Sequence, residues 1–243
     1  MRFLSILLLI SNFSFAQDEG APYYAKEVRW AEQVEEALMD GEVVWLNASG
    51  HKFMSLYTAS ETETKQTAVI VHGLGAHPDW GQVVQPLRVA LAEKGINTLS
   101  IQMPVLANDT DAYQYLPLLN DADQRIRSAV NYIKSQNLNA DYLIAHSLGS
   151  VMSAHYLGDK TQPFKKFVAI GMPDLAVKYL SKVNIPTLDL YGTGDIRSVL
   201  NSVEDRANTA KHNQNYTQKQ VDGDHFFNEK EALLIDAVMQ WIR

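Results

Sequence analysis

The serine in the run Ala145-His146-Ser147-Leu148-Gly149 is the first residue whose setting could support chemistry. The run matches small-x-Ser-x-Gly, a sharp turn between a strand and a helix that exposes a serine hydroxyl above a sheet. Ala145 stands where glycine is usual, and it adds one methyl group, which the turn can tolerate. The helix that follows favours negative charge at its N-terminus. Ser147 is therefore the candidate nucleophile, and the amide of Leu148 is a candidate oxyanion donor.

A serine nucleophile needs a base, and the base needs an acid that orients it. On sheets with this turn, the acid and then the histidine follow the serine along the chain. His225 lies between the last expected strand and the last expected helix and is the candidate base. Asp195 follows the preceding strand, after glycines that let a carboxylate turn back, and is the candidate acid. Asp189, inside that strand, and Asp174, after an earlier one, are the alternative acids.

A second glycine turn, His72-Gly73-Leu74-Gly75, follows an earlier apolar strand. Backbone N–H groups at such a turn can point at a reacting oxygen, so Leu74 is the second candidate oxyanion donor. His72 is expected to hold the loop by hydrogen bonds and to take no part in proton transfer. A metal pair of His72 and His77 is the weaker alternative because no third ligand has suitable spacing. No metal and no cofactor are expected.

Aromatic residues near these segments are candidates for a substrate pocket. Trp80 and Phe226 flank the two proposed catalytic loops, with plain packing as their alternative role. Tyr113 and Tyr115 belong to a long expected loop over residues 105–120, which could wall the site. A pocket of this mixed polar and aromatic kind suits a small-molecule or acyl substrate.

Apolar periodicity predicts the elements that must position these residues. Residues 21–40 have helical spacing, and residues 43–59 indicate two strands around a turn. Further along, continuous apolar strands alternate with amphipathic helices, which predicts a mostly parallel sheet covered on both faces, preceded by an antiparallel hairpin. In such a sheet functional groups gather at the carboxyl ends of the strands. The later strands are expected at 67–73, 96–104, 141–147, 164–171, 185–192 and 216–221, and Asn228 is expected to cap the last helix.

Composition limits the classes of function. The 243 residues are 46% hydrophobic and 20% charged, which is enough for one sizeable core. The net charge is −7 and no dense Lys/Arg stretch occurs, so a nucleic-acid partner has no support. The chain has no cysteine, which excludes disulfides and a cysteine nucleophile.

The N-terminus has the order of regions that is typical of a secretory signal peptide. Met1-Arg2 is a positive start, Phe3–Ile10 is a short apolar run, and Ser14-Phe15-Ala16 is a cleavage site before Gln17. The domain prediction is a signal peptide over 1–16, a helical segment over 17–40 and one catalytic-type domain over 41–243. The mature chain is expected in the periplasm or outside the cell, with no membrane-spanning segment. The apolar run of the signal peptide is itself too short to serve as a membrane anchor.

The motifs together resemble the α/β-hydrolase superfamily, and the chain looks closest to a family of uncharacterised bacterial α/β-hydrolase-like proteins. The resemblance implies the α/β-hydrolase fold, and the short interval 171–186 indicates little or no lid. It implies Ser147 as nucleophile, Asp195 as acid, His225 as base and Leu74 as oxyanion donor. The resembling segments are 72–88, 97–104, 144–150, 188–195 and 216–227.

The signal-peptide pattern, the candidate catalytic residues and the resemblance together predict an exported serine hydrolase that acts on carboxylesters or related acyl compounds. Two alternatives stay open from the sequence. A non-catalytic envelope binding or assembly protein could keep the same fold, because a fold does not determine a function. An acyltransferase would use the same three residues with an acceptor other than water.

Overall fold

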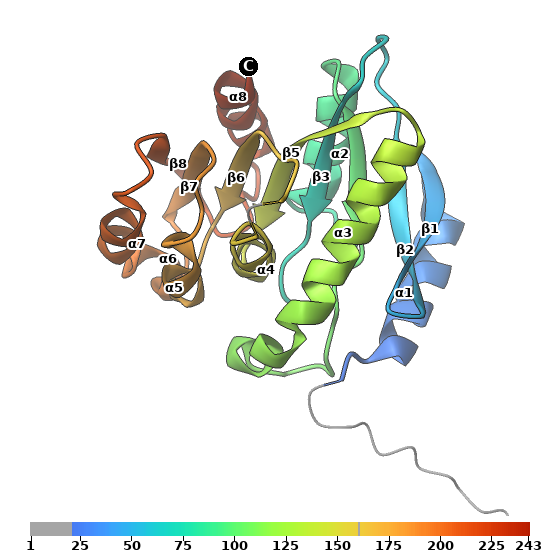
Figure 1. The fold of residues 1–243 in the computed structure, drawn as a ribbon, viewed down its shortest axis with the longest axis horizontal. Coiled ribbons are helices and arrows are strands. Elements are labelled where there is room, and N and C mark those ends of the chain that lie inside the picture. Colours follow the sequence, from blue (N-terminus) through green and yellow to red (C-terminus); the bar gives the residue numbers. More distant parts are fainter. Residues whose placement is uncertain (1–20, 160) are drawn as a thin grey trace, which may run out of the picture.

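The computed structural model describes residues 21–159 and 161–243, and its centre is one eight-stranded sheet (Figure 1). The strands are β1 (Glu42–Ala48), β2 (His51–Thr58), β3 (Gln66–Val71), β4 (Asn97–Ile101), β5 (Asn139–His146), β6 (Lys166–Ile170), β7 (Thr187–Gly194) and β8 (Tyr216–Asp224). Their order across the sheet is β1-β2-β4-β3-β5-β6-β7-β8. β2 is antiparallel to both of its neighbours, and the pairs from β4 to β8 are parallel. The predicted α/β sheet with its N-terminal hairpin is confirmed.

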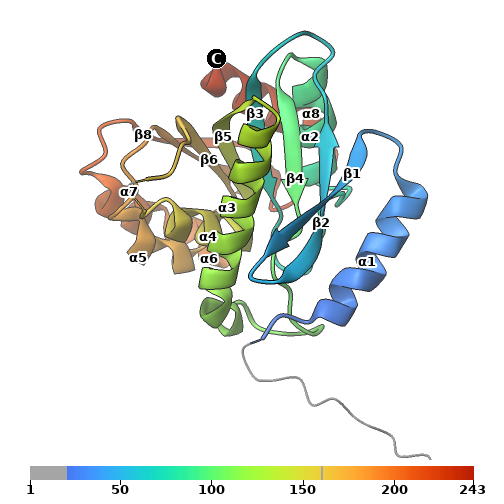
Figure 2. The same ribbon diagram turned by 45° about the vertical axis from the view of Figure 1, so that its right-hand side comes forward.

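Helices cover both faces of this sheet (Figures 1 and 2). The α-helices are α1 (Tyr24–Ala37), α2 (Val84–Glu93), α3 (Leu119–Ser135), α4 (Leu148–Tyr156), α5 (Val177–Leu180), α6 (Arg197–Leu200), α7 (Val203–Ala210) and α8 (Glu231–Ile242). Two 3₁₀ turns, η1 (Ala112–Leu118) and η2 (Asp174–Ala176), precede α3 and α5. The interval between β6 and β7 thus holds only η2 and α5, and the expectation of little or no lid is confirmed.

Alternate side chains of the central strands enter two separate apolar layers. Val69 and Val71 of β3 pack with the inner faces of α3 and α4, whereas Ala68 and Ile70 pack with those of α2 and α8. A strand points successive side chains to opposite faces, so a strand between two helical layers must be apolar throughout. This explains the continuous apolar segments in the middle of these strands, 68–71 in β3 and 142–145 in β5.

Helix α1 covers the hairpin at one edge of the sheet (Figure 2). Ala31 and Val34 pack in a small cluster with residues of β2. Glu27 forms a buried two-point ion pair with Arg125 of α3, at 2.9 Å for each oxygen. The helix expected over 21–40 is therefore present and joined to the sheet domain, whereas the predicted signal peptide over 1–16 lies outside the described residues.

Two local expectations are corrected. The expected loop over 105–120 contains η1 and the start of α3, because Asp111 and Gln114 form a reciprocal capping box at the start of η1. Asn228 does not cap the last helix, which begins at Glu231 after Lys230. The Asn228 side chain instead donates to the Asp224 carboxylate at 2.7 Å. Among the helices of the described residues, none has the length and apolarity to cross a bilayer.

Candidate active site

Ser147 lies on the sharp turn between β5 and α4, with φ 52° and ψ −124°. A positive φ is strained for a residue with a side chain, and such strain is concentrated at functional sites. The Ser147 amide donates to the Ile170 carbonyl of the next strand at 2.8 Å. A Cβ on Gly149 would lie 2.4 Å from the His72 carbonyl oxygen, so only glycine fits there. The predicted turn is thus present, with Ala145 buried in its strand.

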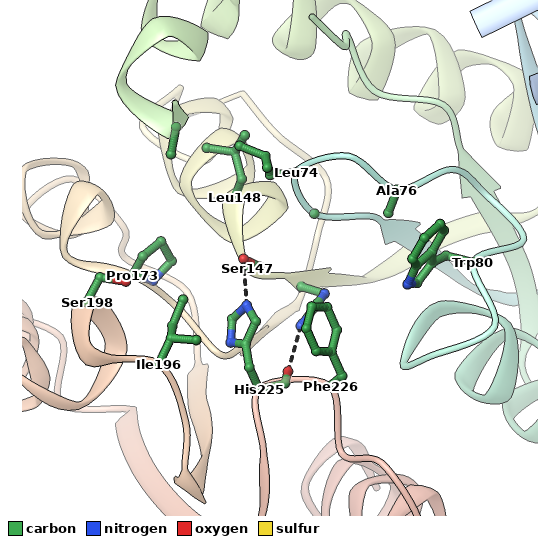
Figure 3. Close-up of a pocket in the computed structure, with 13 residues that line it drawn as sticks. Leu74, Ala76, Trp80, Ser147, Leu148, Pro173, Ile196, Ser198, His225 and Phe226 are labelled. Carbon is green, nitrogen blue, oxygen red and sulfur yellow. Dashed lines mark hydrogen bonds between the residues drawn. The ribbon is translucent and has the colours of Figure 1, made fainter. Parts of the chain in front are cut away.

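Hydrogen bonds join Ser147, His225 and Asp195 in a line (Figure 3 shows the first pair). Ser147 Oγ lies 2.9 Å from His225 Nε2, and His225 Nδ1 lies 2.6 Å from Asp195 Oδ1. The Asp195 carboxylate also accepts the amides of Gly192 at 3.1 Å and Ile196 at 2.8 Å. These amides hold the carboxylate so that it accepts a hydrogen bond from His225 Nδ1–H. His225 Nε2 is then left to accept the serine proton.

The alternative acids have other partners. Asp189 is fully buried and accepts hydrogen bonds from Arg206 at 2.7 Å and from the Tyr216 hydroxyl at 2.6 Å. Asp174 is exposed and caps its own turn through the amide of Leu175. Neither reaches His225, whereas Asp195 does. The structure therefore brings together the three residues chosen from the sequence, while their catalytic roles stay a prediction.

His146, inside the serine turn, supports His225 and was not singled out from the sequence. Its Nε2–H donates to the His225 carbonyl oxygen at 2.9 Å, and the two ring centroids lie 4.9 Å apart. Burial, together with the neighbouring His225, lowers the pKa of His146 to about 4. A neutral ring keeps one N–H to donate and adds no positive charge beside the base. The position of His146 directly before Ser147 was the feature of the sequence that could have indicated this role.

His72 has the structural role expected for it. Its Nδ1 lies 2.8 Å from the Gly73 carbonyl oxygen, and its Nε2 accepts the amide of Met103 at 2.9 Å. Burial lowers the pKa of His72 to about 3. Both ring nitrogens are therefore occupied by the chain itself. His77 accepts the amide of Asp79 through its own Nδ1. The geometry gives no support to a metal pair of these histidines.

The two buried histidines predict a loss of stability in mild acid. Both rings are neutral in the native state at pH values where an unfolded histidine, with a pKa near 6.5, takes up a proton. The free energy of unfolding should therefore fall as the pH drops below about 6.5, by up to about 1.4 kcal/mol per histidine for each pH unit. The contribution of His146 should level off near pH 4 and that of His72 near pH 3, where the native rings also take up a proton. Urea unfolding at pH 8 and pH 5 measures this, and equal midpoints would contradict it.

The loop after β3 presses against the serine. A Cβ on Gly73 would lie 2.9 Å from Ser147 Cβ, so this glycine permits the close approach. Leu74, which follows it, and Leu148, the first residue of α4, line the same pocket as Ser147 (Figure 3). Within the described residues, neither of their amides has a hydrogen-bond acceptor. Both predicted oxyanion donors are therefore at the serine with N–H groups available.

Gly171, directly after β6, makes room for the base and was missed in the sequence. Its φ is +57°, and a Cβ there would lie 3.0 Å from two atoms of the His225 ring. A glycine at the end of the strand beside the serine strand was the signal that could have identified it. Because the sheet order is not written in the sequence, the contact with His225 was not predictable.

Gly171→Ala should lower kcat/KM for an ester by about 10- to 100-fold, because it displaces the His225 ring from Ser147. Gly50→Ala is the matched control. Gly50 also has a positive φ, +85°, but no atom lies within 4 Å of its added Cβ. Both variants pay the backbone cost, and only Gly171→Ala should lose activity in a steady-state assay. Equal activities would refute the positioning role of Gly171.

A pocket of about 350 Å³ opens at Ser147. Trp80 and Phe226 line it, as predicted (Figure 3). Tyr113 and Tyr115 do not, which corrects that expectation. Tyr113 lines a separate surface groove, and Tyr115 is buried with its hydroxyl accepting the amide of Leu106. Of the expected loop wall only Ala112 reaches the pocket, and the lining residues that the sequence did not indicate include Ala76, Pro173, Ile196 and Ser198.

Comparisons with solved structures find this arrangement of strands and helices in α/β serine hydrolases and esterases. The Pyrococcus furiosus esterase Pf2001 superposes with a TM-score of 0.68 at 12% identity, over 86% of this chain and 96% of that one. XC6422 from Xanthomonas campestris, described as an a/b serine hydrolase without lid, has a TM-score of 0.66 at 19% identity, over 84% and 94%. The chain has the α/β-hydrolase fold.

This α/β-hydrolase-fold protein is similar to one further solved structure and, over part of its sequence, to a protein family. Est1E from Butyrivibrio proteoclasticus, also solved with ferulic acid bound, has a TM-score of 0.65 at 15% identity, over 82% of this chain and 97% of Est1E. Residues 11–117 match a family described as "Protein of unknown function (DUF3530)". No curated protein sequence matches the chain. The resemblance to the hydrolase superfamily and to a family of unknown function is confirmed. Because the sequence identities to the solved structures are low, these structures show a shared fold and nothing further.

Proposed function

We propose that the protein is a serine hydrolase that cleaves ester-type acyl substrates through Ser147, His225 and Asp195. The observation that carries the proposal is the pair of short hydrogen bonds, 2.9 Å from Ser147 Oγ to His225 Nε2 and 2.6 Å from His225 Nδ1 to Asp195. These contacts match the geometry by which a base activates a serine and an acid orients the base. A binding protein with no chemistry to perform does not require this geometry.

In the proposed reaction His225 Nε2 takes the Ser147 proton while Oγ bonds to the carbonyl carbon. The amides of Leu74 and Leu148 donate to the resulting oxyanion. The bond to the leaving oxygen then breaks, and His225 returns the proton to that oxygen. Water attacks the acyl-enzyme, His225 takes a proton from the water, and Ser147 Oγ leaves and regains it. Asp195 stabilises the imidazolium in both halves.

The pocket supports a substrate with an apolar part next to the scissile bond. Its walls near Ser147 include Trp80, Pro173, Ile196 and Phe226, and few polar groups face into it. The description of Est1E names ferulic acid, an aromatic acid, as a ligand of that protein. An aromatic or short aliphatic acyl ester is therefore the first substrate class to assay.

A fluorophosphonate probe tests the proposal without a known substrate, because it reacts with activated serines. Wild type should be labelled at Ser147, and Ser147→Ala should not. Ser153→Ala is the matched control, since Ser153 is a buried serine of the same helix whose hydroxyl has no hydrogen-bond partner among the described residues. It should be labelled like wild type. An unlabelled wild type would favour a non-catalytic envelope protein with a retained fold.

Export of the protein is also a proposal, and it rests on the regions of residues 1–16. Expressed with its natural N-terminus in a bacterial host, the protein should be recovered from the periplasm or the medium. Intact-mass measurement should give a chain that begins at Gln17. Full-length protein in the cytosolic fraction would contradict both the cleavage and the export.

A further inference from the structure

We propose that a polar groove next to the reaction pocket binds a neutral, hydroxyl-rich group of the substrate. The groove has a volume of about 400 Å³ and lies beside the loop that follows β3. The inference rests on the proposed function and extends it to the kind of substrate. The polar or aromatic side chains that line the groove are Lys26, Trp30, Asn108, Asp109, Thr110 and Tyr115.

The groove and the reaction pocket share a wall. Gly73, Leu74 and Ala76 line the pocket at Ser147, and Leu74 and Gly75 line the groove. The Leu74 side chain is the residue common to both, and it is 44% exposed. Leu74 is also a proposed oxyanion donor. A substrate held at Ser147 that extends past Leu74 would enter the groove.

Lys26 places an ammonium group in the groove wall, where burial removes most of the water that would solvate the charge. The residue is 6% exposed, and its Nζ donates to the Leu106 carbonyl oxygen at 3.1 Å and lies 4.6 Å above the Trp30 ring. Burial, with Arg29 nearby, lowers the pKa of Lys26, and Asp109 opposes this shift. An ammonium has three donors and a buried one needs partners, so the group has capacity for a ligand oxygen.

Other groups in the groove supply donors and acceptors that the described part of the chain does not use. The Asn108 amide and the Asp109 carboxylate form no hydrogen bond within it, and the Tyr115 hydroxyl accepts the Leu106 amide without donating to an acceptor there. Asp109 lies in a tight turn with φ 62°, and it is exposed and lines the groove. Aromatic rings beside carboxylate, amide and hydroxyl groups can contact both the C–H and O–H groups of a polyol.

The charges of the groove distinguish a neutral ligand from an anion. Lys26 contributes one positive charge and Asp109 one negative charge, close enough for Asp109 to act on the pKa of Lys26. An anion would gain from Lys26 and lose to Asp109. A group with several hydroxyls can donate to the carboxylate and accept from the ammonium at once. The proposed substrate is therefore an ester with a polyhydroxylated part, either in its alcohol half or in its acyl half.

Two matched pairs of esters test the proposal and locate the hydroxylated half. Glycerol 1-monobutyrate is compared with propyl butyrate, and methyl gluconate with methyl hexanoate, by kcat and KM separately. Wild type should prefer the hydroxylated member of one pair by about tenfold or more in kcat/KM, mainly through a lower KM. In Lys26→Met and Asp109→Gly this preference should fall to less than about threefold, while turnover of the plain ester stays unchanged.

The variants are chosen so that folding does not decide the result. Lys26→Met keeps the apolar stem, and Asp109→Gly suits the positive φ while it removes the carboxylate. Lys178→Met is the control, because Lys178 is an exposed lysine of a different groove. If one variant fails to fold, the other still reports the loss of preference.

Each outcome separates the two proposals. An unlabelled Ser147 with no turnover of any ester would overturn the proposed function and this inference with it. Labelling and turnover with equal kcat/KM inside both pairs would overturn the inference alone. A preference for methyl hydrogen succinate over both hydroxylated esters would also overturn it, because the groove would then select an anion.

Discussion

Replacing Ser147 with alanine is expected to lower kcat for an activated ester by about 10⁴- to 10⁶-fold while the fold is kept. The substitution removes the atom that lies 2.9 Å from His225 Nε2 and would bond to the acyl carbon. Without it, only binding and the oxyanion amides of Leu74 and Leu148 remain to stabilise a reaction with water. Steady-state hydrolysis of p-nitrophenyl butyrate, with circular dichroism to check the fold, measures the effect.

Asp195→Asn and Ser153→Ala make this result specific. Asp195→Asn should lower kcat by about 10⁴-fold, because an amide can hold the His225 ring in the wrong tautomer. It should change the overall fold little. Ser153→Ala removes a hydroxyl that has no partner among the described residues and should leave kcat unchanged. Comparable activity of wild type and Ser147→Ala would remove Ser147 from the mechanism whatever the other variants do.

Arg206→Met is expected to destabilise the protein by about 3–5 kcal/mol, the largest stability change that we predict. The Arg206 guanidinium is fully buried and donates to Asp189 at 2.7 Å, to the Val199 carbonyl oxygen at 2.8 Å and to the Ser202 hydroxyl at 2.6 Å. Its removal leaves the Asp189 carboxylate buried without a counter-charge. Urea unfolding followed by tryptophan fluorescence measures the loss.

In the Arg206→Met variant, Tyr216 and Gln218 would still donate hydrogen bonds to Asp189, but they would not neutralise its negative charge. Burial and the Asp189 carboxylate raise the pKa of Tyr216, so its phenol stays protonated and donates to Asp189 at 2.6 Å. Gln218 donates to the same oxygen at 3.0 Å. Neither carries a positive charge, so an isolated buried carboxylate would remain.

The double variant Asp189→Leu/Arg206→Met is the control for this prediction. It removes both charges, so it should be more stable than Arg206→Met alone. Folded Arg206→Met should also keep its ester hydrolysis, because Asp189 does not contact His225. A single variant as stable as wild type would show that the ion pair contributes nothing. A folded but inactive Arg206→Met variant would contradict the assignment of Asp195, and not Asp189, as the acid.

The sequence alone predicted the order of the strands and indicated Ser147, Asp195 and His225 as the first choices for the hydrogen-bonded line. Asp174 and Asp189 stayed open as acids until the structure showed which carboxylate contacts His225. A strand buried on both faces has an apolar run in its middle, so β3 and β5 were predictable as strands from 68–71 and 142–145. Ser147, Asp195 and His225 each follow a strand, and the carboxyl ends of parallel strands meet at one edge of the sheet. Their meeting therefore follows from local pattern and topology. His72 was also readable as a loop-holding residue because of its place at a glycine turn.

Only the tertiary structure decided several of the other residues around that line. Gly171 is next to His225 because β6 lies between β5 and β7, and Lys26 reaches the groove because α1 packs on the hairpin. Tyr113 and Tyr115 were assigned to the wrong cavity because η1 turns one outward and buries the other. Side-chain contacts between distant segments depend on how helices rotate and pack, which local periodicity does not encode. The sequence thus indicated Ser147, its two partners and part of the pocket wall, and packing decided which other residues line the two cavities.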